Sequence, residues 1–175
     1  MKVLAFAASS STKSINKALA NYAASLVSGA EFELLDINDY EMPLFSQDRE
    51  EELGQPQAAK DFFAKLGEAD AIIISLAEHN GSYTAAYKNL FDWTSRIDQK
   101  VFQNKPMVYL ATSPGPGGAA SVLAAATNSA QYFAGDVKAS LSIPSFYDNF
   151  DMETQKLTNA ELDAQLKAAV AQLTE

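Results

Sequence analysis

Segments that read as strands alternate with segments of helical periodicity along the whole chain. Ala71–Ala77 is an almost uninterrupted apolar run, the pattern of a central parallel strand that is buried on both faces. The predicted strands are Lys2–Ala8, Glu31–Ile37, Ala71–Ala77, Pro106–Thr112 and Ala139–Ile143. Apolar residues that recur every three or four positions predict helices. They begin at Ser14, Pro56, Thr84, Ala119 and Thr158.

The ends of these segments give further expectations. The second helix is expected to run to about Glu68, the third to Ile97 and the fourth to Phe133. Thr158 and Glu161 stand three apart and predict a capping box for the last helix. Asp39–Asp48, which contains Pro43, is expected to be a polar loop.

Five βα units without a linker or repeat predict an α/β protein. The expected architecture is a doubly wound, five-stranded parallel sheet with helices on both faces. With about 100–200 residues per domain as a guide, the 175 residues predict a single domain spanning residues 1–175. Ligands of such sheets bind beyond the carboxyl ends of the strands, so the loops after the first, third and fourth strands are the places to look.

Composition and charge exclude several classes of function. Thirteen basic against 22 acidic residues give a net charge of −9, which disfavours binding to nucleic acid or to a membrane surface. There is no cysteine, and His79 is the one histidine, so neither a disulfide framework nor a multi-histidine metal site is expected. The apolar run Val3–Ala8 is shorter than the roughly 7–15 residues of a signal-peptide core. We therefore expect a cytoplasmic protein with no metal site.

The loop after the first strand is rich in hydroxyl groups. It reads Ser-Ser-Ser-Thr-Lys-Ser-Ile-Asn over residues 9–16 and leads into a predicted helix. Free N–H groups and the positive dipole end of a helix N-terminus suit a phosphate, and hydroxyl groups add donors. Helix capping alone would explain Ser14, but it leaves the other hydroxyl groups unexplained. The loop is not a Walker A sequence and suits a flavin monophosphate better than a nucleoside triphosphate.

The other two loops offer backbone groups to a ligand. The loop after the third strand contains Asn80-Gly81, which is a turn signal and also places amides and carbonyls at the sheet edge. The loop after the fourth strand, Ser113–Gly118, has little side-chain bulk and permits close approach. Its Gly115, Gly117 and Ala120 imitate a dinucleotide fingerprint, but in the fourth βα unit rather than the first, so we interpret that match as chance.

Together the three loops resemble those of the NADPH-dependent FMN reductase family, over residues 1 to about 145. The family pattern G-S-x-R-x-x-S-x-N is answered by Ala8, Ser9, Ser11, Ser14 and Asn16. The pattern P-E-Y-N-G-S is answered by residues 77–82, and a lysine–asparagine pair and Asp-Trp follow at residues 88–93. The resemblance implies a flavodoxin-like sheet of strand order 2-1-3-4-5. The chain departs from the family pattern at Ser11, His79 and Ala77, which replace arginine, tyrosine and proline.

The resemblance also implies which residues bind the cofactor. The FMN phosphate would be held by Ser9, Ser11, Ser14, Ile15 and Asn16. The isoalloxazine ring would be bordered by Glu78, His79, Asn80 and Gly81. Its other edge would be lined by Ser113, Gly115 and Gly117. Because the cofactor supplies the chemistry, no catalytic side chain is predicted.

The implied function is an oxidoreductase that passes hydride from NADPH or NADH to FMN, and then electrons to a small-molecule acceptor such as a quinone, an azo compound or free flavin. A homodimer or homotetramer is expected from the same resemblance. A flavodoxin-type electron carrier without NAD(P)H turnover is the alternative, and its acidic surface would suit basic redox partners. A serine hydrolase fits poorly, because the chain lacks G-x-S-x-G.

His79 has two readings. Because imidazole groups in general exchange protons near neutral pH, one reading is that His79 relays a proton to a reduced quinone or stabilises a flavin anion. Alternatively, it is a solvated residue at a loop tip beside the flavin.

Overall fold

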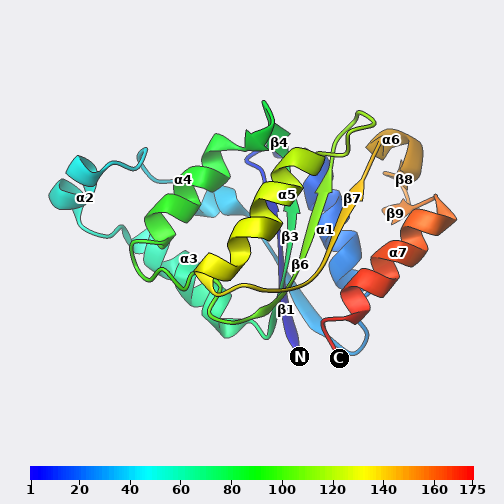
Figure 1. Cartoon of the computed structure of the whole chain (residues 1–175), viewed down its shortest axis with the longest axis horizontal. Coiled ribbons are helices and arrows are strands. Elements are labelled where there is room, and N and C mark those ends of the chain that lie inside the picture. Colours follow the sequence, from blue (N-terminus) through cyan, green and yellow to red (C-terminus); the bar gives the residue numbers. More distant parts are fainter.

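A five-stranded parallel sheet forms the centre of the computed structural model, which describes residues 1–175. The strand order is β2-β1-β3-β6-β7, which confirms the expected order 2-1-3-4-5 (Figure 1). The strands are β1 (Lys2–Ala8), β2 (Glu31–Leu35), β3 (Ala71–Leu76), β6 (Pro106–Thr112) and β7 (Asp136–Ile143). Strand β3 is buried along its whole length, as its apolar sequence predicts.

Helices cover both faces of this sheet, and each face has its own core. Alternate residues of a strand point to opposite faces, so Leu4 and Phe6 belong to one core while Val3 and Ala5 belong to the other. The first core packs against α3 (Gln57–Glu68), α4 (Ala85–Thr94) and α5 (Ala120–Ser129). The second packs against α1 (Ile15–Ser25) and α7 (Ala160–Ala171). In Figure 1, α5 crosses in front of the sheet and α1 lies behind it.

Small elements complete the chain. The 3₁₀ helices are η1 (Ile37–Tyr40) and η2 (Ala130–Phe133), and the short α-helices are α2 (Gln47–Leu53) and α6 (Phe146–Asn149). Two antiparallel hairpins are formed by β4 (Glu78–His79) with β5 (Ser82–Tyr83), and by β8 (Phe150–Asp151) with β9 (Lys156–Leu157). No helix of the structure has both the length and the apolar character that a membrane span requires.

Several predicted boundaries were wrong. The second strand ends at Leu35, because Asp36 accepts a hydrogen bond from the Asn38 amide and begins η1. The predicted loop at residues 39–48 contains part of η1 and the start of α2, which Ser46 caps. The fourth helix becomes 3₁₀ after Ser129.

The last strand and the last helix also differ from expectation. Strand β7 begins at Asp136 rather than Ala139, and its alternating exposure is that of an edge strand. The predicted capping box at Thr158 is wrong. Asn159 is the cap instead, and its side-chain oxygen accepts hydrogen bonds from the amides of Glu161 and Leu162.

Candidate functional site at the carboxyl edge of the sheet

The three predicted loops meet at one edge of the sheet, because β1, β3 and β6 run parallel and end together. Side-chain hydrogen bonds join the loops. The Thr84 hydroxyl, at the start of α4, donates to the Ala8 carbonyl at the end of β1 over 3.0 Å. The Val122 amide of α5 donates to the Glu78 carboxylate over 2.7 Å and so joins the second loop to the helix that follows the third.

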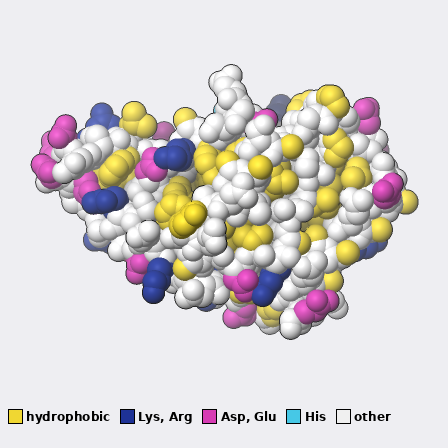
Figure 2. Space-filling view, in the orientation of Figure 1, with side chains coloured by type: hydrophobic (Ala, Val, Ile, Leu, Met, Phe, Trp, Pro, Cys, Tyr) yellow, Lys and Arg dark blue, Asp and Glu magenta, His cyan; other side chains and the backbone are white.

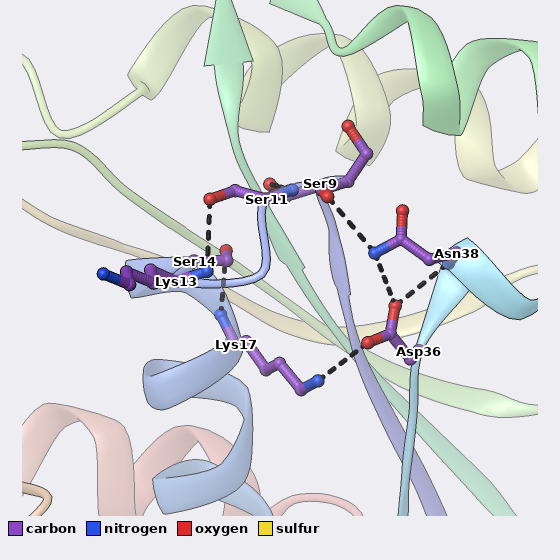
Figure 3. Close-up of polar contacts among 8 residues, drawn as sticks. Ser9, Ser11, Lys13, Ser14, Lys17, Asp36 and Asn38 are labelled. Atoms are coloured by element: carbon purple, nitrogen blue, oxygen red, sulfur yellow. Dashed lines mark hydrogen bonds and ion pairs between the residues drawn. The ribbon is translucent and has the colours of Figure 1, made fainter.

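Three of the four serines of the first loop accept a backbone N–H from a residue two or three positions further along the chain. Ser9 Oγ accepts from the Ser11 amide over 3.2 Å, and Ser11 Oγ accepts from the Lys13 amide over 3.3 Å. Ser14 Oγ accepts from the Lys17 amide over 3.2 Å and caps α1. A hydroxyl group that accepts a hydrogen bond still has its own proton to donate. The three hydroxyl groups thus shape the loop and remain available as donors to an anion (Figure 3).

The N-terminus of α1 adds backbone donors to these hydroxyl groups. The amides of Ser14, Ile15 and Asn16 donate to no acceptor within the chain, as expected for the first turn of a helix. The first turn contains no acidic residue that would neutralise the positive dipole end. This geometry fits the phosphate of a mononucleotide, although the side chain of Ile15 packs against the second core and only its amide can contribute.

No basic side chain of this loop points to the serines. Lys13 is exposed and extends away from Ser9 and Ser11 in Figure 3. Lys17 pairs with Asp36 over 2.9 Å, and hydrogen bonds from Lys17 and from the Asn38 amide lower the pKa of that carboxyl group. An anion bound here would therefore be held by amides and hydroxyl groups rather than by a cation.

The structure gives the side chain of Asn16 a different role from the predicted one. Asn16 is 98% buried, and its side chain lies between the ends of two strands. Asn16 Oδ1 accepts from Ser75 Oγ over 2.7 Å and from the Thr112 amide over 3.2 Å, and Nδ2 donates to the Thr112 carbonyl. This side chain joins α1 to β3 and β6, and only the main-chain amide of Asn16 is free to face a phosphate.

The second loop is a hairpin whose tip is exposed. Asn80 and Gly81 have φ values of 53° and 77°, the pair of positive angles that defines a type I′ turn. His79, Asn80 and Gly81 all lie at this exposed tip. Glu78 differs from these three residues because its carboxylate accepts a hydrogen bond from the first turn of α5, where Ala119 offers no capping side chain.

The glycines of the third loop have two different roles: two of them leave space for a ligand, and a third is required by the backbone. A Cβ atom built on Gly115 or Gly117 meets no atom within 4 Å, so both positions border open space. Gly118, which we did not single out, has a φ of +57°, and a Cβ there would collide with Ser142 and approach Pro144 to 3.1 Å. Ser113 is half-buried, and its carbonyl accepts from the Phe146 amide over 3.0 Å. A run of glycines in sequence does not show which one the backbone requires.

A hollow beside the first loop was not predicted. It has a volume of about 360 Å³ and lies between η1 and the start of α4. Its lining includes Ser10, Asn38, Tyr40, Met42, Ala86 and Asn89. The Asn38 side chain donates to the Ser10 carbonyl over 3.2 Å, so this wall is fixed to the first loop.

Comparison with known proteins identifies the family. A sequence model described as NADPH-dependent FMN reductase matches residues 1–148. The chain belongs to this family.

Relatives and solved structures agree with this assignment. A 2-hydroxy-1,4-benzoquinone reductase of Burkholderia is 35% identical over 122 residues, 69% of this chain. An NAD(P)H-dependent FMN reductase of Pseudomonas aeruginosa is 36% identical over 121 residues, also 69% of this chain. The aligned part spans 64% of the length of each relative. The flavoenzyme NAD(P)H:(acceptor) oxidoreductase of Paracoccus denitrificans has the same fold, with a TM-score of 0.75 and 24% identity over 99% of this chain and 97% of its own.

The structure shows what Ser11 does at the position where the pattern of the FMN reductase family has arginine. The Ser11 hydroxyl group turns into the loop and accepts the Lys13 amide. The loop keeps its shape by this bond, while the charge that arginine would bring is not replaced by either nearby lysine.

Proposed function

We propose that this protein is an FMN-dependent NAD(P)H oxidoreductase that reduces a small-molecule acceptor such as a quinone, an azo compound or free flavin. The observation that carries the proposal is the junction of the serine loop, the free amides of α1 and the two open glycines at one sheet edge. Family membership and the names of the relatives support it. Because the chain covers 64% of those relatives, activity and acceptor are proposals for this chain.

In this proposal the residues of the chain bind and orient the cofactor. The hydroxyl groups of Ser9, Ser11 and Ser14 donate hydrogen bonds to the phosphate, together with the amides of Ile15 and Asn16. The hairpin tip at His79, Asn80 and Gly81 and the loop of Ser113, Gly115 and Gly117 border the flavin ring, and Glu78 acts indirectly by fixing the hairpin to α5. FMN, when bound, supplies the hydride and electron transfer. Residues 1–175 act as one FMN-binding domain, since both cores share the same sheet.

The oligomeric state and location belong to the same proposal. A flavin face that admits two flat substrates in turn is often completed by a neighbouring subunit, so a homodimer or homotetramer is proposed. The cytoplasm is the proposed location. A flavodoxin-type carrier remains the alternative outcome, and the relatives named as reductases favour an enzyme instead.

An absorption spectrum after incubation with FMN and desalting tests the proposal. We expect flavin bands that bleach when NADPH or NADH is added without oxygen. A flavin-loaded protein that neither nucleotide reduces would be a carrier, and a protein that retains no flavin would contradict the assignment of the loop.

A double variant assigns the phosphate site within the chain. Ser9→Ala with Ser11→Ala removes two donors to a charged group and should weaken FMN binding by about tenfold to a hundredfold. The matched control is Ser28→Ala at an exposed position beyond the far end of α1. Equal affinity in the double variant and the control would contradict the assignment.

A further inference from the structure

A separate hollow lies on the outer side of the first loop, between α1 and the β8–β9 hairpin. Its volume is about 360 Å³, within the range of small-molecule sites. One wall includes Ser14, Lys17 and Asn21, which share a face of α1 because three or four positions separate each from the next. The other wall includes Met152 and Gln155. Of the residues proposed to bind FMN, only Ser14 lines this hollow.

Local hydrogen bonds fix the tip of the β8–β9 hairpin. The Asp151 carboxylate accepts from the Glu153 amide and from the Thr154 hydroxyl group, each over 2.9 Å. Gln155 Nε2 donates to the Met152 carbonyl over 2.8 Å. The side chain of Met152 is 47% exposed and offers apolar, polarisable surface to the hollow. This wall is therefore formed before a ligand arrives.

Lys13 gives the hollow one unpaired positive charge. Its side chain extends away from Ser9 and Ser11 and lines this hollow instead, and its ammonium group has no partner in the chain (Figure 3). The charge of Lys17 is neutralised by Asp36. Basic side chains form no continuous patch on the face shown in Figure 2, and the net charge is −9. An anion therefore depends on a local cation, and a single lysine suits a single phosphate group.

Asn21 lies further along the same face of α1 and is half-buried. Its side-chain amide forms no hydrogen bond within the chain, and no sealed polar side-chain atom of the protein lacks a partner, so this amide is accessible from outside. An asparagine amide donates and accepts at once, which matches the N6 and N7 edge of adenine, whereas the same edge of guanine only accepts. Seven residues separate Ser14 from Asn21, about 10 Å along the helix. A nucleoside monophosphate can span this distance.

We infer that the hollow between α1 and the β8–β9 hairpin binds an adenosine 5′-phosphate group, the adenylate half of a dinucleotide. The phosphate lies at Lys13 and the Thr12 hydroxyl group, the base packs against Met152, and the Asn21 amide pairs with the adenine edge. Both FAD and NAD(P)H carry this group. Ser14 borders the hollow and the proposed FMN phosphate site, so the adenylate half of FAD would extend directly from the flavin phosphate. Only this link to the cofactor rests on the proposed function.

Titration with 5′-AMP in the absence of flavin tests the site itself. We expect AMP to shift the amide resonances of Asn21 and Gln155. Lys13→Ala should weaken AMP binding about twofold to fivefold, the range of an exposed charge pair. Adenosine, which lacks the phosphate, should bind this variant and the parent alike. Lys60→Ala is the matched control, because it removes the same charge from an exposed position of α3 on the other face of the sheet.

A second variant tests recognition of the base. Asn21→Ala removes the amide and should weaken AMP binding about twofold to tenfold. The parent should bind 5′-AMP more tightly than 5′-GMP, and this preference should disappear in Asn21→Ala. A preference for AMP that persists in the variant would contradict the pairing of Asn21 with the base.

The Lys13→Ala variant also identifies the dinucleotide. If FAD is the source, the variant should bind FAD about twofold to fivefold more weakly and FMN as the Lys60→Ala control does. If the nicotinamide nucleotide is the source, FAD and FMN should respond alike, and the KM for NADH should rise by this factor while kcat is unchanged.

Three results would overturn the inference. The first is AMP binding that is absent or equally strong in Lys13→Ala and Lys60→Ala. The second is loss of AMP binding in the Ser9→Ala, Ser11→Ala double variant, which would place the AMP phosphate in the proposed FMN site. The third is that neither FAD nor NADH responds to Lys13→Ala. A protein that binds AMP through Lys13 but retains no FMN would instead contradict the proposed function and leave the adenylate site in place.

Discussion

The side chain of Asn16 shows how one residue of the loop can serve the fold rather than a ligand. Three hydrogen bonds connect it to Ser75 and Thr112, all within buried surroundings. Its place in a phosphate-binding pattern was predictable from the sequence. Its partners were not, because they lie 59 and 96 positions further along the chain.

Asn16→Ala should lower the free energy of unfolding by about 2–4 kcal/mol, since it leaves the buried polar groups of Ser75 and Thr112 without partners. Urea denaturation measures this change. Asn21→Ala, at a half-buried position of the same helix, is the control and should cost less than about 1 kcal/mol. Similar losses in the two variants would show that the buried connection stabilises little.

Gly117 offers a cleaner probe of ligand approach. Nothing lies within 4 Å of a Cβ atom at this position, and its φ is not in the left-handed region. Gly117→Val should therefore change the free energy of unfolding by less than about 0.5 kcal/mol, the usual range for surface positions. It should nevertheless reduce FMN retention after desalting. Full retention in a folded variant would remove this glycine from the proposed ring site.

Among the elements, those with strong hydrophobic periodicity were predicted well, while those held by local polar contacts were missed. The strand Pro106–Thr112 was predicted with the correct ends, because both faces of it are apolar. Helix α2 buries no residue and gave no apolar pattern. The turn at Asn80-Gly81 was recognised, but the two-residue strands beside it are too short for any periodicity.

Helix α5 depends on a carboxylate from another element. Glu78 binds the Val122 amide in the first turn, where a negative charge also interacts favourably with the helix dipole. Glu78→Ala should lower the free energy of unfolding by about 1–2 kcal/mol. Hydrogen exchange at the Val122 amide should accelerate as well. The control, Glu52→Ala at an exposed position of α2, should leave that exchange rate unchanged. Equal exchange rates at the Val122 amide in the two variants would contradict the capping role of Glu78.

Helices α1 and α7 are linked by Tyr22 and Asp163. Burial, followed by the hydrogen bond to Asp163, raises the pKa of Tyr22 to about 12, so its hydroxyl group remains a donor. Burial alone would raise the pKa of Asp163, but hydrogen bonds from Lys167 and Tyr22 outweigh it and lower the pKa. A carboxyl group whose pKa is lowered by folding stabilises the protein above its unfolded pKa, and this contribution is lost as the pH falls through the folded value.

Asp163→Asn should therefore reduce the free energy of unfolding by roughly 1 kcal/mol at neutral pH. The difference between parent and variant should shrink as the pH falls below about 4. Thermal unfolding as a function of pH measures it, with Asp148→Asn at an exposed position as the control. A difference that stays constant down to low pH would exclude the charge as its cause.

Across the whole molecule, the net charge of −9 acts on any anionic ligand that approaches. The proposed FMN site has no unpaired cation directed at it, so repulsion from the rest of the surface is not offset locally. The fold could be predicted from patterning at this scale. The positions of the Lys13 and Lys17 side chains, which determine the local charge, could not be predicted. The ion-pair partners of long side chains depend on residues that are distant in the sequence.

The rate of FMN association should consequently rise with salt, by a factor of about two to ten between about 20 and 300 mM NaCl. Stopped-flow quenching of flavin fluorescence measures this rate. A rate that falls with salt would indicate a cationic site and contradict a cradle built from amides and hydroxyl groups.

The exposed position of helix α2 determines where the sequence can tolerate mutation and insertion during evolution. Figure 1 shows it projecting from one end of the molecule. It buries no side chain. Polar contacts near the surface link it to the rest of the chain, such as the ion pair between Glu50 of α2 and Arg96 at 2.9 Å. Mutations, insertions or a grafted segment here would leave both cores intact. This stretch can therefore accept new sequence at little cost in stability.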